Sequence, residues 1–83
     1  MFTNNIENAK RSIRTAMDFD YEVCKSLIKK NPDDTSRYIY QLRLKLEAQA
    51  DMVLCLLEDP NKDEPYQYAL EYRDSLIEKI KAR

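Results

Sequence analysis

The stretch IYQLRLKLEAQADMVLCLL, residues 39–57, decides the fold of this chain. Its apolar side chains recur every three or four residues, which is the spacing of one face of an α-helix. This core stripe contains Ile39, Leu42, Leu46, Gln49, Val53 and Leu56. Pro32 disfavours helical geometry at the residue before it and suits the first turn of a helix. We therefore predict a long helix from just after Pro32 to about Glu58.

A second apolar stripe follows the same helix, through Tyr40, Leu44, Leu54 and Leu57. Residues 52–57 are apolar all round the helix, and such a segment is normally buried on more than one side. The helix thus has more apolar surface than one face requires. Either the domain buries this surplus apolar surface against its other helices, or part of it contacts another chain. An identical chain is the simplest such partner, because symmetric dimers are the commonest oligomers.

Two further helices are expected, one on each side of this stretch. The first runs from an N-cap at Asn4 to about Lys30. Asp18 to Tyr21 disturb its apolar pattern, which leaves two alternatives, one continuous helix or a helix with a kink or break near Asp18. The last begins near Asp63 or Glu64, either of which can cap it, and continues to the C-terminus. Its apolar face contains Tyr66, Ala69, Leu70, Arg73, Leu76, Ile77 and Ile80.

Short polar connections containing proline separate the three predicted helices, at residues 31–35 and 58–65. Three helices joined in this way pack most simply as an antiparallel bundle. We therefore expect an all-α protein: a single helical domain over residues 1–83, with a long first helix, a long second helix, a shorter third helix and a tendency to dimerise.

The chain contains neither glycine nor histidine. Gly-rich phosphate loops are therefore excluded, and the commonest general base and metal ligand are missing. We expect no catalytic site, no metal site and no cofactor, and hence no enzyme. The alternative is an enzyme formed at a dimer interface, which predicts a cavity lined by Arg14, Arg43 or Arg73.

The 14 basic and 15 acidic side chains give a net charge of −1, without the basic excess of a typical nucleic-acid-binding protein. Cys24 and Cys55 each lie in an apolar run, where a free cysteine behaves as a small buried hydrophobe. The first residues do not resemble a signal peptide, and no apolar run is long enough to span a membrane. These features favour a cytoplasmic protein with free thiols and no membrane insertion.

Tyrosine is the principal aromatic residue, with six copies and no tryptophan. Tyr68 and Tyr72 are four residues apart, so we expect them to stack on one helix face. They either pack against the domain or contribute to a partner-binding patch, because tyrosine is enriched at protein interfaces. The residues expected to contact a partner are Tyr38, Tyr40, Leu44, Leu54 and Tyr68.

Lys10, Arg11 and Arg14 form a compact basic group on the first helix, which could contact an anion. The leading functional hypothesis is a non-enzymatic interaction module that regulates, inhibits or adapts a partner protein. By analogy, many accessory factors encoded by bacteria and phages are small domains of this kind. The alternative is a small helical dimer that binds nucleic acid through the basic group.

Overall fold

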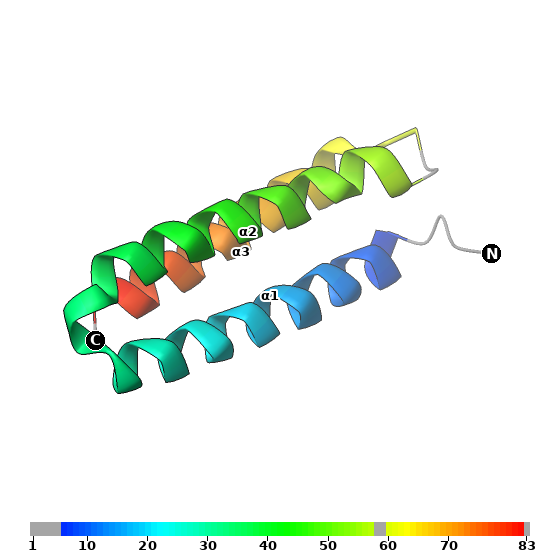
Figure 1. The fold of residues 1–83 in the computed structure, drawn as a ribbon. Helices are drawn as coiled ribbons and strands as arrows, with labels where there is room; N and C mark the ends of the chain where they lie inside the picture. Colours follow the sequence, from blue (N-terminus) through cyan, green and yellow to red (C-terminus); the bar gives the residue numbers. More distant parts are fainter. Residues whose placement is uncertain (1–5, 58–59, 83) are drawn as a thin grey trace.

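The computed structural model describes residues 6–57 and 60–82, which form three long helices and one short one. Helix α1 spans Ile6–Lys30, the 3-10 helix η1 spans Pro32–Asp34, α2 spans Thr35–Leu56 and α3 spans Asp63–Lys81. The predicted all-helical class is confirmed. The ribbon reverses direction at each connection, so α1 and α3 run the same way (Figure 1). The molecule is a rod of 44 × 19 × 16 Å.

Helix α1 continues without interruption from Ile6 to Lys30, so the break considered near Asp18 does not occur. Three of the four residues that disturb the apolar pattern have a place in the packing, whereas Phe19 is exposed. Tyr21 is buried, while Asp18 accepts a hydrogen bond from α3 and Asp20 accepts one from α2. The predicted N-cap, Asn4, lies outside the described residues.

The first connection ends α1 and begins α2 within a few residues. The Asn31 N–H still donates to the Leu27 carbonyl, but a φ of −135° at Asn31 leaves the helical region, as expected before Pro32. The Thr35 hydroxyl then donates to the Pro32 carbonyl over 2.6 Å. These bonds satisfy backbone groups that two adjoining helix ends would otherwise leave unpaired.

The second connection begins at Leu57, whose extended backbone (φ −76°, ψ 129°) ends α2. The Lys62 ammonium donates to the Leu54 carbonyl over 2.7 Å and so satisfies one of the last carbonyls of α2. The prediction that Asp63 or Glu64 caps α3 is wrong. Both lie inside its first turn, where their negative charges interact favourably with the positive end of the helix dipole.

The core lies between the three helices and contains no buried charged side chain among the described residues. It is formed by Met17, Tyr21, Cys24, Leu42, Leu46, Ala50, Val53, Leu57, Ala69, Leu76, Ile77 and Ile80. Leu42, Leu46 and Val53 of the predicted stripe of α2 are buried and Ile39 packs against them, while the Leu56 side chain lies outside the description. Leu57, which we expected among the surplus residues, is buried because it follows Val53 by four positions and so lies on the core side.

Candidate interaction surface

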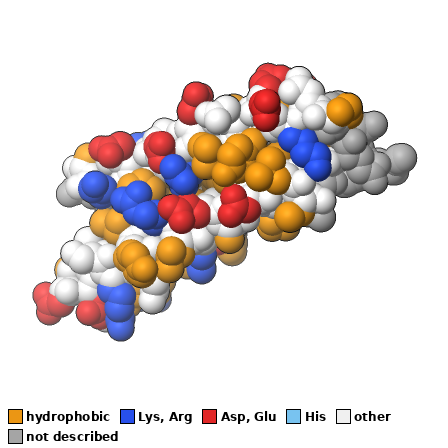
Figure 2. Space-filling model, turned by 90° about the horizontal axis from the view of Figure 1, so that it is seen from above, with side chains coloured by type: hydrophobic (Ala, Val, Ile, Leu, Met, Phe, Trp, Pro, Cys, Tyr) orange, Lys and Arg blue, Asp and Glu red, His pale blue; other side chains and the backbone are white. Residues whose placement is uncertain are grey.

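The outward face of α2 exposes large apolar side chains. Tyr40 is 60% exposed, Leu44 47%, Met52 48% and Leu54 42%. Figure 2 looks down on α2 and shows hydrophobic side chains gathered near the middle of this face, with charged side chains around them. The three helices therefore bury only part of the surplus apolar surface that the sequence predicts for this helix.

Helical geometry arranges this surface as a line. Tyr40, Leu44, the exposed Ala48 and Met52 follow one another at four-residue steps, which keeps them on one side of α2 over about 18 Å. Leu44 lies opposite the buried side of the helix. We call these four residues the α2 line. Ala48 and Met52 were not among the residues predicted to contact a partner, although the four-residue spacing is visible in the sequence.

Three charged residues, Arg43, Glu47 and Asp51, follow the flank of the α2 line that faces α3. Glu47 lies 3.7 Å from the Arg73 guanidinium, and Asp51 accepts a hydrogen bond of 3.3 Å from the Tyr66 hydroxyl. The half-buried Arg43 differs from them, because it has no hydrogen bond or ion pair with any of the residues that the structure describes. It is a cation beside an apolar surface without an internal partner.

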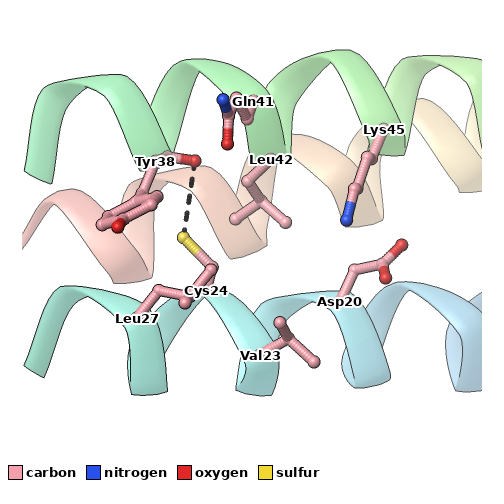
Figure 3. Close-up of a pocket in the computed structure, with 8 residues that line it drawn as sticks. All are labelled: Asp20, Val23, Cys24, Leu27, Tyr38, Gln41, Leu42 and Lys45. Carbon is pink, nitrogen blue, oxygen red and sulfur yellow. Dashed lines mark hydrogen bonds between the residues drawn. The ribbon is translucent and has the colours of Figure 1, made fainter. Parts of the chain in front are cut away.

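Two of the five residues predicted to contact a partner lie elsewhere. Tyr38 is half-buried against the core, and its backbone carbonyl accepts the Cys24 thiol over 3.6 Å (Figure 3). Tyr68 lies where α1 meets α3. The structure thus brings Tyr40, Leu44 and Leu54 together on the outer surface of α2, and separates them from Tyr38 and Tyr68.

The contact between α1 and α3, which we call the seam, is a ladder of polar contacts. Lys10 pairs with Glu64 at 2.6 Å, Arg14 donates to the Tyr68 hydroxyl at 2.8 Å, and the Tyr72 hydroxyl donates to Asp18. Each contact is four residues beyond the previous one on both helices, because α1 and α3 run in the same direction.

The predicted stacking of Tyr68 on Tyr72 is confirmed and reinforces the seam. The two rings are 6.0 Å apart with planes inclined by 14°, and the Lys10 ammonium lies 5.3 Å from the centre of the Tyr68 ring. Burial, followed by the hydrogen bond to Asp18, raises the pKa of Tyr72 to about 12. The hydrogen bond with Glu64 raises the pKa of Lys10. Both shifts favour the protonated forms that make the contacts.

The basic group on α1 is therefore largely engaged within the domain. The Lys10 side chain is only 15% exposed and is paired, Arg14 contacts Tyr68, and Arg11 donates to the Asn8 side chain over 3.1 Å. An incoming phosphate would have to replace these contacts. The arrangement thus gives the nucleic-acid alternative no preformed anion site.

A small pocket lies between α1 and α2, with Asp20 and Lys45 extending toward each other across it (Figure 3). Its volume of about 30 Å³ suits one or two water molecules, whereas small-molecule sites usually exceed about 300 Å³. None of the three arginines of the enzyme alternative lines this pocket. Burial raises the pKa of the Cys24 thiol at its wall, which makes that thiol a poor nucleophile.

The expectation that both cysteines are buried is wrong for Cys55. Both cysteines are free, but only Cys24 is buried, whereas Cys55 is exposed on the outer surface of α2. The apolar run 52–57 predicted burial on more than one side. Val53 and Leu57 are buried, whereas Met52, Leu54 and Cys55 are exposed to solvent.

Further features bear on other classes of function. Over residues 6–57 and 60–82, no group of three or more acidic or cysteine side chains is placed to hold a metal ion. None of the described helices combines the length and the apolar character that a membrane span requires. Comparisons with protein-family models, curated proteins and solved structures find no match to this chain.

Proposed function

We propose that this protein is a non-enzymatic interaction module that binds another protein through the outward face of α2, and so regulates, inhibits or adapts that partner. The observation that carries the proposal is the exposure of Tyr40, Leu44, Met52 and Leu54 on one helix. Contiguous apolar surface on a small domain costs solubility, and it commonly marks a binding site.

The residue types on this face suit recognition. Tyr40 can bury a large ring with few rotatable bonds, as tyrosines at the energetic centres of interfaces do. Met52 is flexible and polarisable, so it can adapt to an irregular partner surface. The charged residues beside them, Arg43, Glu47 and Asp51, would form the polar rim that surrounds a typical interface.

The state of the thiols supports a reducing compartment for this module. Cys55 is exposed and Cys24 is buried, and the two are not joined. A secreted domain of this size usually depends on disulfides, whereas a cytosolic one keeps its thiols reduced. We therefore propose a cytoplasmic location.

The proposal is tested by affinity capture from a lysate of the source organism, read by mass spectrometry. The bait is the full chain, compared with a variant carrying Leu44→Glu and Leu54→Glu. Phe19→Glu is the matched control, because Phe19 is 68% exposed but lies on α1. Circular dichroism and thermal melting establish first that all three baits are folded.

The expected result is one protein recovered in near-stoichiometric amount with the wild type and with Phe19→Glu, and lost with the double variant. Direct titration with the purified partner then gives the affinity and the stoichiometry. Equal recovery by the wild type and the double variant would contradict the proposal, because binding would then use another surface.

A further inference from the structure

We propose that a second copy of this chain occupies the outward face of α2, with the two α2 helices antiparallel about a two-fold axis midway between Leu44 and Ala48. This inference rests on the proposed function, because it concerns the same face, which a different partner would bind in exchange for the second copy. It is carried by the match of that face to itself, in shape and in charge.

The apolar match follows from the α2 line. An axis between Leu44 and Ala48 sets Leu44 of one copy against Ala48 of the other, and Tyr40 against Met52. Every member of the line then faces another member. Each contact joins a large side chain with a small or flexible one, and the small Ala48 lets the helices approach closely, as ridge-into-groove packing requires.

The charge match follows from the flank that holds Arg43, Glu47 and Asp51. In an antiparallel pair related by a two-fold axis, this flank of one copy lies beside the same flank of the other. Arg43 of one copy then comes opposite the position midway between Glu47 and Asp51 of the other, about 3 Å along the axis from each. The arginine that lacks an internal partner among the described residues thus gains two carboxylates, and symmetry repeats the contact.

A parallel pair would lack this complementarity. Its two-fold axis would run along the helices and would place this flank of one copy on the opposite side of the interface from the same flank of the other copy, so Arg43 would lie far from Glu47 and Asp51 of that copy. The helix dipoles also favour the antiparallel pair, because each helix end then lies near an end of opposite partial charge. The charges on the face therefore select one orientation as well as one partner.

Sedimentation equilibrium over a range of concentrations tests the dimer. The wild type and Phe19→Glu are expected to change from monomer to dimer as concentration rises, whereas Leu44→Glu stays monomeric and folded. A wild type that stays monomeric at every concentration would overturn the inference. Affinity capture of a different protein through α2 would still support the proposed function in that case, so the two failures are distinguishable.

Charge reversal tests the orientation. Arg43→Glu alone and Asp51→Arg alone each place like charges together twice in an antiparallel dimer, so each should raise the dissociation constant on the order of ten- to a hundredfold. A chain carrying both changes brings opposite charges together again at positions 43 and 51 of the antiparallel dimer, although Glu47 still repels the new carboxylate, so it should dimerise more tightly than Arg43→Glu alone. In a parallel dimer the double variant would dimerise no more tightly than Arg43→Glu alone, and that result would overturn the proposed geometry.

A spin label on Cys55 gives an independent measure, because the buried Cys24 should not react in the folded chain. In the proposed dimer Cys55 lies opposite Arg37 of the other copy, so the two labelled positions are separated by about 27 Å along the helix axis. Pulsed dipolar spectroscopy should report a separation of that order. Labels in close contact would show a parallel pair and overturn the antiparallel geometry.

Discussion

The seam between α1 and α3 and the outward face of α2 use similar side chains in opposite ways. In the seam, Lys10, Arg14 and Tyr72 each contact a residue of the other helix. On the outward face, Tyr40 and Leu44 lie in solvent, and Arg43 has no partner within the described part of the chain. The difference teaches that a tyrosine or an arginine indicates an interface only once the surface opposite it is known.

The largest expected effect on stability comes from making the same change, leucine to alanine, on the two sides of α2. Leu46 is fully buried and Leu44 is about half exposed. Leu46→Ala should lower the free energy of unfolding by about 2–5 kcal/mol, because it removes packed methyl groups and leaves a cavity. Leu44→Ala should change it by less than about 0.5 kcal/mol. Urea denaturation at a concentration where the chain is monomeric measures both, and equal losses would contradict the assignment of Leu44 to the outside.

A second comparison tests the seam. Tyr72→Phe removes the hydroxyl that donates to Asp18 and leaves a half-buried carboxylate without that donor. We expect a loss of about 1–2 kcal/mol in the free energy of unfolding. Tyr66→Phe is the matched control, because its hydroxyl makes a longer, exposed bond to Asp51. If the two variants were equally stable, the hydrogen bond from Tyr72 to Asp18 would contribute nothing to the packing of α1 on α3.

The seam should also make stability depend on alkaline pH. The pKa of Tyr72 is raised from 10.0 to about 12 in the folded chain. Because the folded chain holds the hydroxyl proton more tightly than the unfolded chain, this stabilisation is complete below pH 10 and is lost as the pH rises toward 12. The wild type should therefore lose stability over this range more steeply than Tyr72→Phe. Parallel curves for the two proteins would contradict the raised pKa.

The smallest expected effect involves no change in stability. A thiol reagent should modify Cys55 rapidly in the folded protein and reach Cys24 only after denaturant is added, because burial shields Cys24 and raises the pKa of its thiol. Timed thiol counting with and without denaturant measures this. Two thiols reacting at one rate in the native protein would mean that the core is open near Cys24.

Most of the fold could be predicted from the sequence, because its determinants are local. The periodic apolar residues of α2, the prolines that end helices and the absence of glycine require only neighbouring positions. The positions of the helices followed closely from these features. The caps were less predictable, since Asp63 and Glu64 lie inside α3 rather than before it. The choice among adjacent polar residues at a helix end depends on contacts with other helices.

The candidate site was predictable only in part. Tyr40, Leu44 and Leu54 were assigned to a surface from their excess over what two neighbouring helices can cover, and they are exposed. Tyr68 and Lys10 could not be placed in the seam in advance. Their partners lie 54 residues away along the chain, and nothing in a single sequence sets the register of α1 against α3.

The most direct test of the contrast between interior and outward face uses the methyl groups of two methionines. Met17 is fully buried and Met52 is 48% exposed on the α2 line. In a chain labelled at its methionine methyl groups, a dilution series should shift the Met52 resonance while the Met17 resonance stays fixed. Met52→Leu assigns the signal. A Met52 resonance that is constant over a range in which sedimentation shows dimerisation would contradict the account, because another surface would then hold the two copies together.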